Sequence, residues 1–253
     1  MVKKTISTQR IKRVILKGLN LKNIVQDVTR KLFIRKRNKP QGLFFFIQGG
    51  NCMIKRIVVG PIQENCYIVS FGSNCVIIDP GDEPKSIIEE TAQLDVKGIL
   101  ITHGHYDHIG AVNELRDYYH TNVYATEDAK DMMLDWDENL SVMLGGEKYI
   151  VDDVIAIEDS ITLGEMYFGI YKTPGHAKGS CLYYYAKEDA LFTGDTLFKG
   201  GCGRVDFPTG DKFSLIKSLS RIKNLDLDAD VYPGHGPEST LSFEKKNNPF
   251  LSF

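Results

Sequence analysis

The sequence predicts an α/β fold in which helices cover β-sheets. Short runs rich in Ile and Val recur along residues 53–253 and are separated by turn residues, which is typical of strands. Segments with a helical spacing of apolar residues lie between these runs. The chain has 253 residues, enough to bury the core of one large domain or two small ones.

In the first half, strands are expected at residues 54–59, 66–70, 75–78, 96–101 and 123–125. The turn-prone residues Gly72, Ser73 and Asn74 lie between the second and third of these strands, so the two are expected to pair. Helices are expected at 84–91, with Pro84 in the first turn, at 111–119 and at 127–134. An acidic loop that contains Trp136 follows.

In the second half, strands are expected at residues 160–163, 167–172, 181–185, 190–193 and 231–232. Gly164 and Glu165 separate the first two of these strands, which predicts a hairpin. Amphipathic helices are expected at 213–222 and 239–246.

The composition is ordinary for a soluble globular protein, with 42% apolar and 25% charged residues. No apolar run approaches the roughly 18 residues that a membrane span needs, so no membrane partner is expected. The five cysteines form no Cys-x-x-Cys pair and are Cys52, Cys66, Cys75, Cys181 and Cys202. This odd, scattered set favours a reducing cytoplasm over a disulfide framework.

Residues 1–52 differ sharply in charge from the rest of the chain. They hold 13 Lys and Arg against one acid, which leaves 18 bases and 32 acids, a net charge of −14, in residues 53–253. A basic arm for nucleic acid or membrane and a transit peptide are two interpretations. The favoured one is a disordered or non-native extension, because Gln48-Gly49-Gly50 can be encoded with AAGGAGG, a bacterial ribosome-binding sequence, ahead of Met53. The working domain is then 53–253.

Metal-binding residue types follow four predicted strands. The strand at 96–101 is followed by His103, that at 167–172 by His176, that at 190–193 by Asp195 and that at 231–232 by His235. Sites in α/β sheets gather outside the carboxyl ends of strands, so these four loops are expected to converge on one point.

The histidines and aspartates are expected to bind two divalent metal ions. His103 and His105 are two residues apart and point the same way in an extended segment, so they can bind one ion, with His176 completing that site. Asp107 and His108 follow in a turn and can bind a second ion together with His235. The two oxygens of Asp195 make it the natural bridge between ions about 3.5–4 Å apart.

Two simpler interpretations compete with a catalytic metal site. A lone histidine is more often a surface or core residue, and His120 at a predicted helix end is interpreted so. Five of six histidines and two aspartates in four strand-end loops instead form the pattern of a functional site. A structural zinc site favours closed, Cys-rich ligand sets, which these loops do not offer. Imidazole and carboxylate suit zinc, iron or manganese.

The motifs Thr-His-Gly-His-Tyr-Asp-His (102–108), Pro-Gly-His (174–176), Thr-Gly-Asp-Thr (193–196) and Pro-Gly-His-Gly (233–236) resemble those of the metallo-β-lactamase superfamily. Within it, the chain resembles the short bacterial members of the glyoxalase II-like (hydroxyacylglutathione hydrolase-like) branch. The matching stretches are GPIQENCYIV (60–69), IDPGDEP (78–84), GGCGRVDFPTGD (200–211) and PGHGPESTLSFEKKNNPF (233–250). The resemblance covers nearly all of 53–253 and implies a four-layer αββα sandwich with the metals at one edge of its two sheets.

The resemblance also implies a reaction. A small hydroxyacyl thioester would be hydrolysed by a metal-bridged hydroxide, with zinc the favoured metal and iron or manganese as alternatives. His103, His105 and His176 match the first metal site of the family, Asp107, His108 and His235 the second, and Asp195 the bridging aspartate. Asp107 is also expected to orient the nucleophile, so that Asp107 and Asp195 are the expected catalytic residues.

The chain departs from the long glyoxalase II enzymes in two places. It has only about 18 residues after His235, too few for their C-terminal helical domain. Where they have Gly-Cys-Gly-Lys followed by an aromatic pair, this chain has Gly-Cys-Gly-Arg-Val-Asp (201–206). Arg204 can replace the charge of the lysine, and Asp206 is expected to pair with it. Both residues are expected to contact the substrate, and the thiol carrier stays open.

Three other functions fit the sequence less well. A persulfide dioxygenase with one iron is the main alternative, because its loop also reads Cys-Gly-Arg-x-Asp-Phe, but Gly234-His235-Gly236 differs from the Ala-His-Asp of that branch. A nuclease is disfavoured by the acidic domain and by the lack of an inserted domain, so no nucleic-acid partner is expected. A β-lactamase proper is disfavoured because residues 1–52 have no apolar segment typical of a secretion signal.

Overall fold

The computed structural model describes residues 51–252, which form one compact unit. The predicted basic extension, residues 1–52, lies outside the described residues except for Asn51 and Cys52. Strand β1 begins at Cys52, one residue before the predicted boundary, and the amide of Gly72 donates a hydrogen bond of 3.3 Å to the carbonyl of Asn51. The described fold therefore includes both residues.

Six strands form the first sheet, in the order β1-β2-β3-β4-β5-β6. They are β1 (Cys52–Val59), β2 (Glu64–Phe71), β3 (Asn74–Ile78), β4 (Asp95–Leu100), β5 (Val123–Ala125) and β6 (Val154–Ala156). β1, β2 and β3 pair antiparallel, whereas β3 to β6 run parallel. Crossovers between the parallel strands contain helices α2 (Pro84–Thr91), α3 (Tyr106–Ile109), α4 (Val112–Tyr119), α5 (Glu127–Met133) and α6 (Ser141–Gly145).

The second sheet has the order β14-β13-β10-β9-β8-β7. Its strands are β7 (Ser160–Leu163), β8 (Met166–Lys172), β9 (Cys181–Tyr185), β10 (Ala190–Gly194), β13 (Asp230–Pro233) and β14 (Ser239–Thr240). Helices α7 (Lys212–Lys223) and α8 (Leu241–Asn247) and the 3-10 helix η1 (Pro249–Leu251) follow in this half, and β11 (Leu197–Phe198) and β12 (Gly201–Cys202) form a small separate ribbon.

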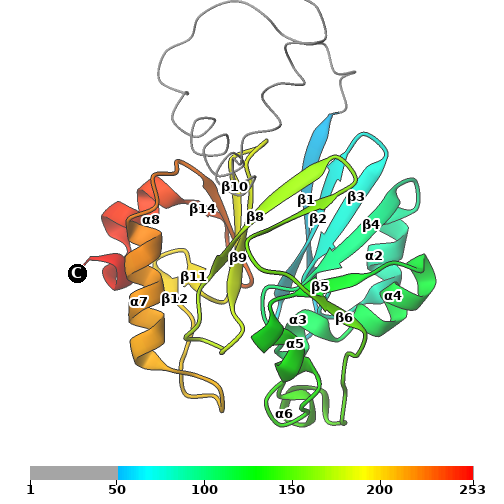
Figure 1. Ribbon diagram of the computed structural model, residues 1–253, viewed down its shortest axis with the longest axis horizontal. Helices are drawn as coiled ribbons and strands as arrows, with labels where there is room; N and C mark the ends of the chain where they lie inside the picture. The colour runs from blue at the N-terminus through cyan, green and yellow to red at the C-terminus, as the bar shows by residue number, and fades with distance from the viewer. Residues whose placement is uncertain (1–50, 253) are drawn as a thin grey trace, which may run out of the picture. The chain divides into compact units, whose positions relative to one another are not determined.

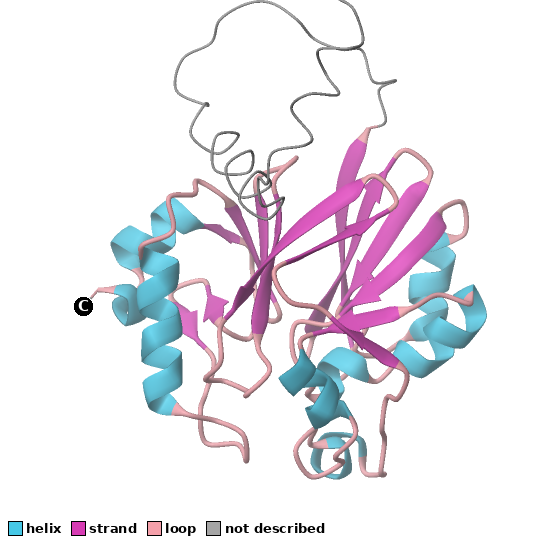
Figure 2. Cartoon of the chain, in the orientation of Figure 1, coloured by secondary structure: helices cyan, strands magenta, loops and turns pink. Residues whose placement is uncertain are grey.

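The two sheets face each other and helices cover both outer faces, as Figure 1 shows with α2 and α4 on one side and α7 and α8 on the other. Figure 2 shows the same arrangement as helical, strand, strand and helical layers. The predicted α/β class and its four-layer αββα form are confirmed.

Three apolar clusters hold these layers together. One joins α2 and α4 to the first sheet, one lies between the sheets and one joins α7 and α8 to the second sheet. Ile77 belongs to the first cluster and Ile78 to the second, because successive residues of β3 point to opposite faces of the sheet. A strand buried on both faces explains why the strand runs are continuously apolar rather than alternating.

Several local predictions differ from the structure. Residues 239–246 do not form a single helix, because Ser239 and Thr240 pair with β13 and the helix begins at Leu241, capped by the Thr240 hydroxyl. The predicted acidic loop contains the short helix α6, and strand β6 was missed because its three residues carry too little pattern. Asp107 and His108 lie in helix α3 rather than in a turn.

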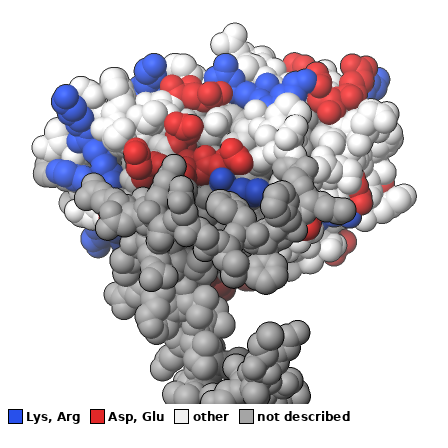
Figure 3. All heavy atoms as spheres, turned by 90° about the horizontal axis from the view of Figure 1, so that it is seen from above, with Lys and Arg blue, Asp and Glu red and all other residues white. Residues whose placement is uncertain are grey.

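On the face drawn in Figure 3, acidic and basic side chains are interspersed, unlike the continuous basic face typical of nucleic-acid binders. No helix within residues 51–252 combines the length and apolar character needed to cross a membrane.

Candidate metal centre

All seven predicted ligands lie in one cluster at the ends of strands from both sheets. The loop after β4 of the first sheet carries His103, His105, Asp107 and His108. The other three follow β8, β10 and β13. β10 pairs parallel with β13, and β9 runs antiparallel to both β10 and β8, so β8 runs in the same direction as β10. The carboxyl ends of these three strands therefore lie at one edge of the second sheet. The predicted convergence is therefore present, but it joins two sheets rather than one.

One group in this cluster consists of His103, His105 and His176. A ligand atom from each lies within 4.8 Å of the others, and all three side chains are buried. Nδ1 of His105 is 3.0 Å from Nε2 of His176. Three imidazoles at this spacing are a typical ligand set for a divalent transition metal.

A second group consists of Asp107, His108 and His235. Helix α3 presents Asp107 and His108 on consecutive positions of one turn. Oδ2 of Asp107 lies 3.1 Å from Nε2 of His235 and 3.5 Å from Nε2 of His108. This group also offers one ligand atom per residue within 4.8 Å.

Asp195 lies between the two groups. Its Oδ2 is 3.6 Å from Nε2 of His176 in the first group and 3.7 Å from Nε2 of His235 in the second. Its Oδ1 is 3.3 Å from Nε2 of His108, although the two atoms are not aligned as a hydrogen bond. One carboxylate thus contacts both groups.

The cluster fits bound cations because its buried polar atoms lack partners. Nε2 of His103, Nε2 of His108 and Oδ1 of Asp195 are buried without a hydrogen bond among the described residues. Such atoms are rare in folded proteins and call for a ligand or ion. Burial lowers the pKa of His103, and lowers that of His105 to about 3, so both rings keep a lone pair for a metal at neutral pH. Although burial disfavours its charge, the neighbouring His108 holds the pKa of Asp195 below its usual range.

Asp79 orients His108 and the loop that carries it. Thr102 donates to it twice, from the backbone nitrogen to Oδ1 at 2.7 Å and from Oγ1 to Oδ2 at 2.6 Å. Nδ1 of His108 lies 3.1 Å from Asp79 Oδ2. A carboxylate only accepts, so the proton is on Nδ1 and Nε2 is left for a metal. Asp79 is not among the site residues that the sequence predicts, although it lies in the stretch IDPGDEP (78–84).

His176 is oriented in the same way by a backbone group. Its Nδ1 donates to the carbonyl oxygen of Arg204 at 2.8 Å, which leaves Nε2 facing the cluster. The loop of Arg204 therefore contributes to the geometry of the first group through its backbone.

Glu64 is a second buried carboxylate that the sequence did not point to as a site residue. It is 1% exposed, both of its oxygens lack a hydrogen bond, and Oε1 lies 3.5 Å from Nδ1 of His108. Burial raises the pKa of Glu64 well above its usual range. It lies in the quoted stretch GPIQENCYIV, behind His108.

The glycine before His235 is required by close packing around the cluster. A Cβ on Gly234 would lie 2.3 Å from Oδ1 of Asp195 and 2.6 Å from Cε1 of His108. This requirement is visible in the sequence, since glycine precedes three of the four predicted strand-end ligands.

Arg204 and Asp206 form a bidentate ion pair, as expected. Arg204 Nε donates to Oδ1 at 2.6 Å and a terminal nitrogen donates to Oδ2 at 2.5 Å. Arg204 also lies over the ring of Phe207. The centroid of the Phe207 ring is 5.5 Å from that of His105 and 6.4 Å from that of His176. Both charged side chains are exposed at the border of the first group and reach no ligand of the cluster directly.

The C-terminal segment anchors the loop that leads to Arg204. The buried carboxylate of Glu244 accepts from the amide of Gly200 at 2.9 Å and from Nδ2 of Asn248 at 2.7 Å, and it also accepts from the Ser239 hydroxyl. Nδ2 of Asn248 in turn donates to the carbonyl of Gly201 at 3.0 Å. The stretch SFEKKNNPF therefore holds this loop in place.

We expect Glu244→Ala to destabilise the protein by about 2–4 kcal/mol, because it leaves buried donors without an acceptor. Urea unfolding followed by circular dichroism measures the change. Glu238→Ala is the matched control, since its side chain is 49% exposed and its pair with Arg56 is long at 3.9 Å. Equal losses in both variants would contradict the anchoring role.

The sequence profile of the metallo-beta-lactamase superfamily matches residues 59–235, which include all seven residues of the cluster. The chain belongs to this superfamily. Its fold agrees with that of solved structures.

Curated relatives of the superfamily include metallohydrolases. "Probable metallo-hydrolase YqgX" of Bacillus subtilis is 36% identical over 78% of this chain and 97% of its own length. "Hydroxyacylglutathione hydrolase GloC" of Haemophilus influenzae is 34% identical over 79% of this chain and 98% of its own length. These relatives place the chain among the metallohydrolases of the superfamily.

Solved structures with the same fold carry differing descriptions. BLEG-1, described as a B3 metallo-beta-lactamase, is 38% identical with a TM-score of 0.74 and covers 79% of this chain and 100% of its own. TTHA1623 in a di-iron-bound form is 36% identical with a TM-score of 0.70, covering 78% and 100%. ETHE1 from Myxococcus xanthus is 26% identical with a TM-score of 0.61, covering 78% and 83%.

Proposed function

We propose that this protein is a thioester hydrolase of the glyoxalase II type that cleaves a small hydroxyacyl thioester. The observation that carries the proposal is the buried cluster of five histidines and two aspartates, in which Asp195 contacts both ligand groups. The relative from Haemophilus influenzae named as a hydroxyacylglutathione hydrolase supports the thioester as substrate.

Two divalent ions are proposed, with zinc favoured and iron or manganese as alternatives. The first would be held by His103, His105 and His176 and the second by Asp107, His108 and His235, with Asp195 shared between them. When bound, such ions lower the pKa of a water molecule and polarise the carbonyl under attack. The di-iron form of TTHA1623 keeps iron as a specific alternative.

The chain's own residues would position the reactants. Asp107, only 12% exposed, can accept a proton or hydrogen bond from the attacking water, and it borders the open side of the cluster. The leaving thiol has a pKa of about 8.5, so it can depart as thiolate without a strong general acid. We assign the thiol carrier to Arg204 and Asp206, where an anionic carrier would compete with Asp206 for the guanidinium.

The proposed setting is the cytoplasm, with a small-molecule thioester as the partner. All five cysteines are unpaired, and Cys66, Cys75 and Cys181 are buried. Free buried thiols suit a reducing compartment.

Two alternatives have a specific observation behind them. An iron-dependent persulfide dioxygenase is favoured by the loop Cys-Gly-Arg-Val-Asp-Phe (202–207) and by the likeness to ETHE1. Hydrolysis of β-lactams is favoured by the likeness to BLEG-1, which is described as a B3 metallo-beta-lactamase. This likeness counts against the earlier reason to disfavour a β-lactamase, namely the missing apolar segment in residues 1–52.

We expect the metal-loaded full chain to hydrolyse thioesters such as S-lactoylglutathione with a kcat/KM of at least about 10⁴ M⁻¹ s⁻¹. Thiol release measures this activity, and mass spectrometry of digested protein gives the metal content. The same preparation is assayed for penicillin hydrolysis and for oxygen uptake with glutathione persulfide. One iron per chain with rapid oxygen uptake, or faster turnover of β-lactams than of any thioester, would overturn the proposal.

A further inference from the structure

We propose that the pocket beside Asp107 is the subsite for the acyl group and that it selects small acyl groups without a negative charge. This inference rests on the proposed thioesterase function and deepens it. No residue of this pocket other than Asp107 was among the predicted site residues.

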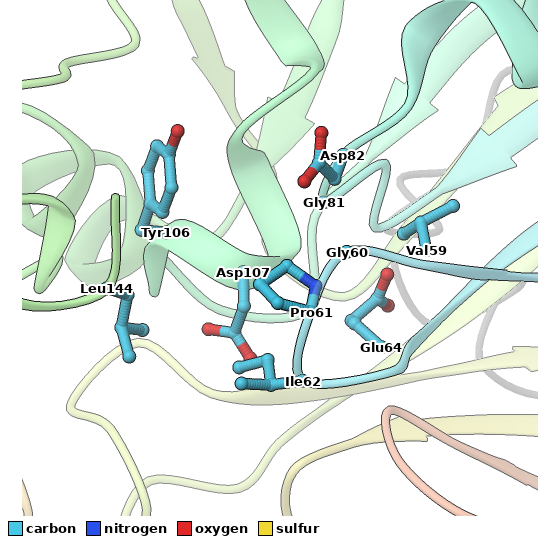
Figure 4. Close-up of a pocket in the computed structure, with 10 residues that line it drawn as sticks. All are labelled: Val59, Gly60, Pro61, Ile62, Glu64, Gly81, Asp82, Tyr106, Asp107 and Leu144. Atoms are coloured by element: carbon cyan, nitrogen blue, oxygen red, sulfur yellow. The ribbon is translucent and has the colours of Figure 1, made fainter. Parts of the chain in front are cut away.

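The pocket opens beside the second ligand group. It encloses about 340 Å³, including the part open to solvent, and its walls include Ile62, Tyr106, Asp107 and Leu144. Figure 4 shows Ile62 next to the carboxylate of Asp107, with Leu144 and the ring of Tyr106 on its far side. Because part of this volume is open to solvent, the space between the walls is smaller still, so a small group fits and a long chain does not.

The walls come from segments fixed near the cluster. Tyr106 and Asp107 are the first residues of helix α3, and Ile62 lies in the turn between β1 and β2. Leu144 comes from helix α6, which lies in the segment predicted as an acidic loop. A group held between these side chains is therefore adjacent to a predicted metal ligand.

The charges on the walls disfavour an anionic acyl group. The lining residues include the carboxylates of Asp82 and Asp107 and no Lys or Arg. The charge of Asp107 is offset when a metal is bound, but Asp82 is exposed at the rim and is not a predicted ligand. A dicarboxylic acyl chain would place its free carboxylate near Asp82, and like charges repel.

The thiol carrier has a separate place at the first ligand group. Phe207 packs against His105 and His176, and Arg204 lies over its ring. None of these four residues lines the pocket beside Asp107. A thioester whose carbonyl lies over the cluster can therefore direct its acyl group to Leu144 and its carrier to Arg204.

The test enlarges the pocket and compares acyl groups on one thiol. Leu144→Ala should raise the ratio of kcat/KM for hexanoyl over propionyl thioester at least tenfold, since a methylene in a fitted pocket changes selectivity by about 10–200-fold. Met143→Ala is the matched control, because Met143 is 59% exposed on the same helix and does not line the pocket. In Met143→Ala, the ratio of kcat/KM for hexanoyl over propionyl thioester should stay within about twofold of that of the parent protein. The parent should also prefer a butanoyl over a succinyl thioester at least tenfold.

A binding measurement separates this inference from the proposed function. Calorimetry uses S-propyl- and S-hexylglutathione, which cannot be hydrolysed. The affinity for the hexyl compound relative to the propyl compound should rise in Leu144→Ala and should not change in Met143→Ala, compared with the parent protein. The inference of an acyl subsite would be overturned if Leu144→Ala changed neither the kcat/KM ratio nor the affinity ratio, or if Met143→Ala changed them equally. Either result would leave the proposed thioester hydrolysis intact. If the parent hydrolyses no thioester, the proposed function fails, and the binding ratio alone then supports or overturns the subsite.

Discussion

Asp195→Ala is expected to abolish hydrolysis, with kcat reduced at least 10³-fold, and to lower the metal content from two ions per chain to one or fewer. The reason is that its two oxygens contact both ligand groups, Oδ2 at 3.6 Å from His176 and 3.7 Å from His235. On the proposed ligand assignment, the substitution would take a ligand from both ions at once and leave close histidines without a compensating charge. Thiol-release kinetics and metal analysis of the same sample measure the two effects.

Asp206→Ala serves as the control for metal content. Asp206 is an aspartate that lies further along the chain from Asp195. Its side chain is exposed and, among the ion pairs of the described residues, pairs only with Arg204. It should retain both ions. Full activity and two ions in Asp195→Ala would refute the bridging role.

Asp79→Ala is expected to destabilise the protein by several kcal/mol and to weaken metal binding about 10–100-fold. Asp79 accepts from Thr102 twice and from His108, and the change leaves these buried donors without an acceptor. It also frees the His108 ring to turn away from the cluster. Urea unfolding of the metal-free protein and competition with a chromogenic chelator measure the two quantities separately.

Asp82→Ala is the matched control for this variant. Asp82 lies three residues further along the same segment but is exposed, so its replacement should change stability by no more than about 0.5 kcal/mol. Metal affinity equal to that of the parent in Asp79→Ala would show that His108 is oriented by other contacts.

Elements with a strong local pattern were predicted closely. Helix 84–91 has the predicted bounds because Pro84 marks its first turn, and strand 160–163 was bounded by the turn at Gly164. Elements that depend on distant partners were not. Strand β6 has three residues and exists because it pairs with β5, and Ser239–Thr240 is a strand only because β13 lies beside it.

The sequence by itself determined the residue types and their order: strand ends followed by His103, His176, Asp195 and His235, each of a residue type that can bind a metal. Chemistry encoded in neighbouring residues can be read without a structure. Only the tertiary structure decided which other residues contact these side chains and their loops, because contacts between segments far apart in the chain leave no local pattern. Asp79 behind His108, Glu244 beneath the loop of Arg204, and Leu144 beside Asp107 are such contacts.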